Sequence, residues 1–194
     1  MAEVTIEQFY PMHIGYALNP FHDDIKKDLT KYCFDLQSDI EKGGNNWISN
    51  QTYNTCDTYN IVRDEKFERL NNWVTEKVSE FSNNLNIKDK LKLLTGWFNI
   101  YNKNDFQEFH THKPYIISCV YFLHGDNNGS RLFFNNDREL LEYSTLGSST
   151  WHQPIEGKLV IFSSYIPHSV ERHTLDSSRI SLAYNYGKAG MWIV

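Results

Sequence analysis

The stretch HTHKPYIISCVYFL, residues 110–123, places two histidines one residue apart in front of an apolar run. An apolar run of this length, rich in isoleucine, valine and aromatic residues, is typical of a buried β-strand. Because successive side chains of a strand alternate between its faces, His110 and His112 are predicted to share one face. The pair could hold a ligand or could lie at a solvated loop end, and other parts of the chain must decide.

A third histidine, His168, follows the apolar segment KLVIF and lies in SSYIPHSV, where Pro167 marks the end of a strand. Eleven residues later Arg179 and Ser181 open another strand and face the same side of it. Neutral imidazoles bind first-row divalent metals, and a guanidinium presents a planar fork that matches a carboxylate. The three histidines with Arg179 and Ser181 therefore indicate a site for one metal and one anionic ligand.

Helical spacing of apolar residues predicts two helices in the first half of the chain. The first covers residues 20–40, with Asn19 as its N-cap and Pro20 at its first position, and the second covers about 64–83. The second half contains strand-like segments separated by turns. These segments are residues 91–101, 115–123, 131–134, 158–162 and 179–186. This order predicts a mainly β chain of the α+β class, with a sandwich or barrel and the helices packed outside one sheet.

Composition narrows the class of protein. The chain has 194 residues, which favours a single domain, and 40% of them are hydrophobic and 22% charged. The net charge is −5, and the 19 lysines and arginines are scattered, which argues against a nucleic-acid-binding protein.

Cysteine usage and the terminus bear on the location of the protein. Cys33, Cys56 and Cys119 form no CxxC motif and leave at least one thiol unpaired, as in a reducing compartment. The N-terminus lacks the basic start and apolar core of a signal peptide, and the longest apolar run, residues 116–123, is too short to span a membrane. We expect a cytoplasmic protein that does not insert into membranes.

The segments just described resemble those of the Fe(II)/2-oxoglutarate-dependent oxygenases, in particular the prolyl-hydroxylase-like branch with a His-x-His opening. The resemblance covers residues 97–186 and rests on five blocks in order: WFNIYNKNDFQEFHTH, SCVYFL, GSRLFF, PIEGKLVIFSSYIPHSV and SRISLAYNY. It implies a double-stranded β-helix, a jelly-roll or cupin-like barrel. Residues 1–90 would be helical support and 91–194 the core of one domain spanning 1–194. It also implies a mononuclear Fe(II) and a hydroxylation by O₂ coupled to oxidative decarboxylation of 2-oxoglutarate.

Carried over by position, the resemblance makes His110 the first metal ligand and His168 the distal one. Arg179 and Ser181 would hold the distal carboxylate of 2-oxoglutarate. His112 stands where the wider superfamily has an aspartate or glutamate, a departure that the His-x-His branch shares. We expect His112 to be the third ligand of the catalytic metal.

Two alternatives to this ligand set remain open from the sequence. A carboxylate from Asp105, Glu108 or Asp126 could replace His112, although none has the required spacing on the same strand. His173 is the one rival of His168, but its charged neighbours predict a solvated loop position.

Tyrosines on two predicted strands are candidate cosubstrate contacts. Tyr101 and Tyr121 should line the barrel, where either hydroxyl could bind 2-oxoglutarate or substrate, or either ring could simply pack. The segments most suited to form a lid over the site are residues 43–60 and 136–155, the second with Tyr143 and Trp151.

Three functions are compatible with the sequence. The first is an Fe(II)- and 2-oxoglutarate-dependent dioxygenase that hydroxylates a C–H bond of a peptide or small molecule. The second is a cupin-like three-histidine dioxygenase that uses no 2-oxoglutarate. The third is a non-catalytic barrel that serves as a binding module. The sequence specifies neither the substrate nor the oligomeric state.

Overall fold

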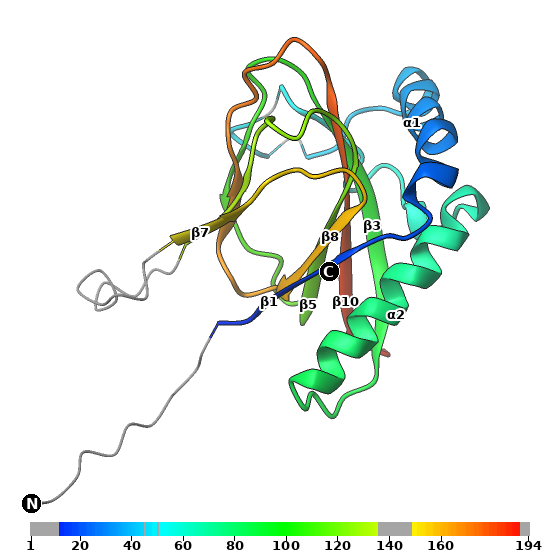
Figure 1. The fold of residues 1–194 in the computed structure, drawn as a ribbon, viewed down its shortest axis with the longest axis vertical. Coiled ribbons are helices and arrows are strands. Elements are labelled where there is room, and N and C mark those ends of the chain that lie inside the picture. Colours follow the sequence, from blue (N-terminus) through cyan, green and yellow to red (C-terminus); the bar gives the residue numbers. More distant parts are fainter. Residues whose placement is uncertain (1–11, 45, 50, 136–148, 191–194) are drawn as a thin grey trace, which may run out of the picture.

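The structure is a computed structural model that describes residues 12–44, 46–49, 51–135 and 149–190. It contains two helices and two antiparallel β-sheets (Figure 1). The larger sheet has the strand order β1-β8-β5-β10-β3-β2 and the smaller one the order β4-β9-β6-β7. Their strands are β1 (Ile14–Leu18), β2 (Tyr53–Asn54), β3 (Leu91–Tyr101), β4 (Gln107–His110), β5 (Ile117–His124), β6 (Leu132–Asn135), β7 (Ser149–His152), β8 (Lys158–Ser163), β9 (His168–Val170) and β10 (Arg179–Lys188).

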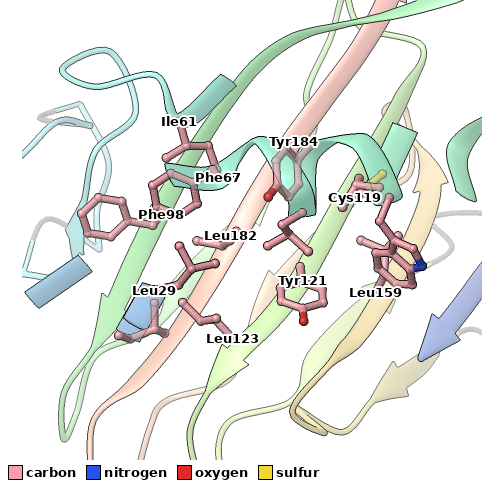
Figure 2. Close-up of a cluster of buried hydrophobic side chains, with 14 of the residues drawn as sticks. Leu29, Ile61, Phe67, Phe98, Cys119, Tyr121, Leu123, Leu159, Leu182 and Tyr184 are labelled. Atoms are coloured by element: carbon pink, nitrogen blue, oxygen red, sulfur yellow. The ribbon is translucent and has the colours of Figure 1, made fainter. Parts of the chain in front are cut away.

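The two helices lie on the outer face of the larger sheet (Figure 1). Helix α1 spans His22–Asp39, and α2 spans Glu68–Asn84 after two short 3₁₀ turns at Ile61–Arg63 and Glu65–Phe67. Figure 2 shows the apolar layer between helices and sheet, in which Leu29 of α1 lies near Leu182 of β10 and Leu123 of β5. None of the described helices is long and apolar enough to cross a membrane.

A second apolar cluster fills the space between the two sheets. Val120, Phe122 and Phe162 contribute from the larger sheet, and Leu132 and Phe134 from the smaller one. The ring centroids of Phe134 and Phe162 are 4.8 Å apart across this space. The larger sheet is therefore buried on both faces, which explains the continuous apolar character of KLVIF and SCVYFL.

The predicted architecture is confirmed, with differences at particular elements. Residues 1–90 were expected to be helical support with an extended piece at 9–18. Strand β1 lies within that piece at one edge of the larger sheet, and β2, at the other edge, was not predicted. The first helix begins at His22, two residues later than predicted. The side-chain oxygen of Asn19 instead accepts a hydrogen bond from the main-chain N–H of Phe21 at 3.0 Å.

The histidine pair does not lead directly into the apolar strand. His110 is the last residue of β4, and His112 lies in the connection before β5 begins at Ile117. The main-chain N–H of His112 donates to the carbonyl of Ser164 at 2.9 Å, which fixes this connection beside the end of β8. We expected strand alternation to place both imidazoles on one face. That explanation is wrong, because only His110 belongs to a strand.

Candidate metal and anion site

Three imidazoles meet between the two sheets. His110 ends β4, His168 begins β9 directly opposite it in the strand register, and His112 reaches the same point from the following connection. The Nε2 atom of His112 lies 3.2 Å from that of His110 and 3.1 Å from that of His168. In the part of the chain that the structure describes, these three residues form the only group of three or more histidine, cysteine, aspartate or glutamate side chains that could hold a metal.

The hydrogen bonds of two rings determine which nitrogen faces the centre. The Nδ1 atom of His110 lies 2.8 Å from the carbonyl oxygen of Glu108, and that of His168 lies 2.9 Å from the carbonyl oxygen of Ile166. A carbonyl accepts only, so both Nδ1 atoms must carry the proton, which leaves the lone pair on Nε2. The carbonyls thus orient the lone pairs of both Nε2 atoms toward His112.

This arrangement fits a divalent metal. Lone pairs of neighbouring Nε2 atoms repel one another, and one proton on His112 could satisfy only one of its two neighbours. A metal with nitrogen ligands at about 2.1 Å and at right angles would hold them roughly 3 Å apart, close to the observed separations. Burial lowers the pKa of all three imidazoles, that of His168 to about 3, so the neutral form that binds a metal prevails at neutral pH.

None of the carboxylates considered from the sequence joins this group. Glu108 accepts from the main-chain N–H groups of Ile48 and Ser49, and Asp105 accepts from that of Asn102. Asp126 accepts from the main-chain N–H of Asn128. Each of these carboxylates is therefore engaged in a local turn or contact.

His173 is also outside the group, and its predicted exposure is wrong. The side chain is fully buried, with Nε2 2.7 Å from the carbonyl oxygen of Ser177 and Nδ1 3.4 Å from the hydroxyl of Ser130. Both ring nitrogens of His173 thus have hydrogen-bond partners, and His173 is not a metal ligand in this arrangement.

Arg179 is a buried cation at the other end of the same interior. Its side chain is 0% exposed, and its guanidinium lies 4.8 Å from the ring centroid of Tyr101 and 5.0 Å from that of Phe122. Only Nη1 has a described partner, the hydroxyl of Ser130 at 3.3 Å, while Nε and Nη2 have none. Burial lowers the pKa of Arg179 to about 10, yet the group stays charged at neutral pH.

Two buried guanidinium nitrogens without hydrogen-bond partners are costly, so an anion placed against Arg179 would be stabilised. Ser181 lies two residues further along β10, is 2% exposed, and shares the face of Arg179. The residues present therefore fit a carboxylate at this end of the interior.

The two candidate tyrosines face opposite sides of the larger sheet. Tyr101 lies in the interior against Arg179, as expected. Tyr121 does not line the barrel, because Val120 and Phe122 on either side of it point inward and strand alternation turns it outward. Figure 2 shows it among the side chains beneath the helices, and its hydroxyl contacts Asn19 and His22 of the helix layer at 3.0 and 2.8 Å.

Sequence reasoning missed two tryptophans beside the site. Trp47 lies in the segment expected as a lid, and its ring centroid is 4.7 Å from that of His110. Trp97 on β3 lies 5.4 Å from His112. Its position two residues before Asn99 and four before Tyr101 could have predicted its inward direction, whereas no local pattern identified Trp47.

The second expected lid segment is only partly described. Trp151 belongs to β7 and stacks on Phe133 of the neighbouring strand, with ring centroids 5.6 Å apart. Tyr143 lies outside the described residues. Trp151 is therefore part of the smaller sheet.

Comparisons with known proteins agree with this geometry. Residues 95–185 match the model of the family described as "Putative 2OG-Fe(II) oxygenase". A search of curated protein sequences gave no match. The structure is similar to a prolyl-4-hydroxylase from Pseudomonas putida, with 15% identity, a TM-score of 0.65, and coverage of 91% of this chain and 93% of that chain.

Two further structures show the same fold. A Trichoplax adhaerens prolyl hydroxylase in complex with a hypoxia inducible factor peptide fragment has 13% identity and a TM-score of 0.67, over 90% of this chain and 83% of that one. HygX from Streptomyces hygroscopicus with nickel, 2-oxoglutarate and hygromycin B bound has 12% identity and a TM-score of 0.62, over 92% and 84%.

The fold is the double-stranded β-helix of 2-oxoglutarate oxygenases, although the described strands form two separate sheets and no closed barrel. Over residues 95–185, its strand-rich half, the chain is similar to the 2OG-Fe(II) oxygenase family.

Proposed function

We propose that this protein is a dioxygenase that hydroxylates a C–H bond, with Fe(II) held by His110, His112 and His168 and 2-oxoglutarate held by Arg179. One observation carries the proposal: three convergent Nε2 atoms share an interior with a buried guanidinium, two of whose nitrogens have no hydrogen-bond partner. His110, His112 and His168 would hold the metal, and the metal would bind the keto acid and O₂.

When bound, the iron and 2-oxoglutarate would supply O₂ activation, with one oxygen atom going to the substrate as a hydroxyl and the other to succinate as CO₂ is lost. The residues of this chain position and shield the reactants. Arg179 and Ser181 fix the far carboxylate of the cosubstrate, and the carbonyls of Glu108 and Ile166 hold two imidazoles in the ligating orientation.

The protein supplies no described carboxylate to the metal, which is unlike a two-histidine, one-carboxylate site. The three-histidine site is therefore about one charge more positive, and an anionic cosubstrate would compensate for it. This charge balance favours a site that uses 2-oxoglutarate over a three-histidine dioxygenase without a cosubstrate, since such an enzyme would have no use for Arg179.

The site indicates the metal and the cosubstrate more directly than the class of substrate. Two proteins of similar fold were crystallised with a peptide fragment and with hygromycin B. We propose a peptide or small-molecule substrate that enters beside Trp47 and Trp97, whose rings lie against the histidines. We also propose a cytoplasmic location, since the three thiols are free, and fractionation of the source cells would test it.

An anaerobic titration of the apo-protein with Fe(II) and then 2-oxoglutarate tests the proposal. We expect a visible charge-transfer band that needs both ligands and disappears in His110→Ala. Arg179→Ala should retain iron but bind 2-oxoglutarate about 10- to 100-fold more weakly, since a buried charge-assisted contact is lost. Iron binding without the band would favour the cosubstrate-free dioxygenase, and absence of iron binding would favour the non-catalytic module.

A further inference from the structure

His112 is held in place differently from the other two histidines of the candidate metal site. The rings of His110 and His168 are each oriented by a main-chain carbonyl two residues earlier in the chain. His112 lies in a connection, where its main-chain N–H donates to the carbonyl of Ser164 at 2.9 Å and its carbonyl accepts from the N–H of Tyr115 at 3.0 Å. The position of His112 therefore depends on what fixes Ser164.

Ser164 follows the end of β8 and is fixed through both its main chain and its side chain. Its main-chain N–H donates to the carbonyl of Ile116 at 3.0 Å, and its hydroxyl oxygen lies 2.7 Å from that of Ser118 on β5. Ser118 in turn donates to the side-chain oxygen of Asn185 on β10 at 2.7 Å. Because a hydroxyl has one proton, the hydroxyl of Ser164 must donate to that of Ser118. The hydrogen bonds thus run in one direction, from Ser164 through Ser118 to Asn185.

These three polar side chains are buried in the interior between the two sheets. Ser164 is 0% exposed, Ser118 1% and Asn185 2%. Ser118 and Asn185 are register partners that face inward, because the residues on either side of each belong to the apolar layer under the helices. The next inward residue of β5, Val120, belongs to the apolar cluster between the sheets. Burying polar groups is costly unless they are paired, so packing alone does not explain a polar network here.

The network lies beside the candidate metal site. Ser118 pairs with Phe162 of β8, and the ring centroid of Phe162 lies 4.6 Å from that of His168. At the end of the network, the carbonyl of Ser164 accepts from the main-chain N–H of His112. The network therefore contacts the histidine that lies in a connection, whereas the other two lie at strand ends.

We propose that Ser118, Ser164 and Asn185 form a positioning network that holds His112 as the third ligand of the metal. This inference rests on the proposed function. The network fixes Ser164, and the carbonyl of Ser164 fixes the connection from which the imidazole of His112 reaches the other two ligands. A histidine outside a strand can thereby take the place of the carboxylate in a two-histidine, one-carboxylate site.

A double-mutant cycle separates the positioning of His112 from a general effect on the fold. Calorimetric titration of the apo-protein measures its affinity for Ni(II), which binds imidazole sites more tightly than Fe(II) and so keeps the weaker His112→Ala site measurable. Ser118→Ala removes the central hydroxyl of the network and is made both in the wild type and in His112→Ala. Tyr121→Phe is the matched control, because it removes a buried, hydrogen-bonded hydroxyl three residues further along β5 on the opposite face of the sheet.

We expect Ser118→Ala to weaken Ni(II) binding about tenfold in the wild type, as is usual when a group that orients a metal ligand is lost. In His112→Ala the same change should alter the affinity by less than about twofold, because no imidazole remains to be positioned. Tyr121→Phe should leave Ni(II) affinity within about twofold of the wild-type value although it lowers the melting temperature.

Two results would overturn the inference. Unchanged Ni(II) affinity of Ser118→Ala would show that the network does not act on the metal site, and equal losses in the wild type and in His112→Ala would show a general effect on the fold. If Ser118→Ala does not fold, Ser164→Ala cuts the same network and is read in the same cycle. A wild-type protein that binds no Ni(II), or a His112→Ala protein that binds it as tightly as the wild type, would instead overturn the three-histidine site of the proposed function.

Discussion

At the scale of single residues, the orientation of two imidazoles by main-chain carbonyls sets the chemistry of the site. Glu108 and Ile166 accept from the Nδ1 atoms of His110 and His168, so both Nε2 atoms are available as ligands without any proton rearrangement. Burial then keeps the rings neutral. Metal binding at neutral pH should consequently release few protons.

The first prediction concerns the pH dependence of metal affinity. The neutral imidazole binds metal, so affinity is complete above the pKa and is lost as pH falls through it. Because burial lowers the pKa of His110, His112 and His168 below the usual 6.5, affinity should stay level from pH 8 to about 6. Calorimetric titration with Co(II) across this range measures it. A tenfold loss centred near pH 6.5 would show that the histidines titrate as exposed groups do.

The second prediction uses the two tyrosines that face opposite sides of the sheet. Tyr121→Phe removes a hydroxyl that contacts Asn19 and His22, so it should destabilise the fold by about 1–2 kcal/mol and leave 2-oxoglutarate affinity unchanged. Tyr101→Phe removes a hydroxyl from the interior beside Arg179 and should weaken 2-oxoglutarate binding. Thermal melts and anaerobic titrations of both variants distinguish the roles, and weaker cosubstrate binding by Tyr121→Phe would contradict the assignment.

At the scale of elements, the short β4 strand connects the metal site to the segment that carries Trp47. The carboxylate of Glu108 accepts from the main-chain N–H groups of Ile48 and Ser49, while its carbonyl accepts from His110. Burial alone would raise the pKa of Glu108, but hydrogen bonds from Ser49, Gln107 and Ile48 hold it at about 2. Glu108 thus positions both the candidate ligand His110 and the segment that carries Trp47.

The third prediction follows from that carboxylate. Glu108→Gln replaces one accepting oxygen by a donor, so we expect the melting temperature to fall by a few degrees, at about 2–4 °C per kcal/mol. The carboxylate stabilises the fold above its unfolded pKa of about 4.5, and this contribution is lost as pH falls toward 2. The difference from the wild type should therefore shrink between these pH values.

Glu80→Gln is the matched control, because Glu80 pairs with Lys77 on the surface of α2. It should melt within about 1 °C of the wild type, since exposed ion pairs contribute little. A Glu108→Gln protein that melts as the wild type does at neutral pH would show that the carboxylate does not hold the Trp47 segment.

The long elements were predictable from sequence and the short ones were not. The long elements begin and end within a few residues of their predicted bounds; these are α2, β3, β5, β8 and β10. Each contains enough apolar residues in a regular pattern to be recognised. Strands β4, β7 and β9 have three or four residues each, too few to define a period. Their pairing is set by the opposite strand, so the sequence alone could not show that His110 and His168 are register partners.

At the scale of the whole molecule, the two faces of the larger sheet have different roles, one in packing and one in the candidate site. Its outer face packs against the helices through residues such as Leu182 and Tyr184, and its inner face carries Arg179, Ser181 and Asn185. The three histidines of the candidate metal site and Arg179 could be predicted from residue types and spacing. The inward direction of Asn185 and the outward direction of Tyr121 needed the register of the sheet.

The fourth prediction is that ligands stabilise the whole domain. A metal and a cosubstrate held between the two sheets bind the folded state only, so together they should raise the melting temperature. At a hundredfold excess over Kd, each ligand contributes about 2.7 kcal/mol, or roughly 5–10 °C. Redox-inert Zn(II) with 2-oxoglutarate permits the measurement in air, and a melting temperature that 2-oxoglutarate leaves unchanged after metal addition would count against a shared site.

The most direct test of the central claim is the ligand environment of the iron. X-ray absorption of the anaerobic Fe(II) protein, before and after addition of 2-oxoglutarate, counts imidazole ligands and detects a chelating oxygen ligand. We predict three imidazoles, reduced to two in His112→Ala, and two new oxygen ligands with 2-oxoglutarate in the wild type. Two imidazoles with a protein carboxylate, or no change on adding 2-oxoglutarate, would contradict a three-histidine iron site that binds this cosubstrate.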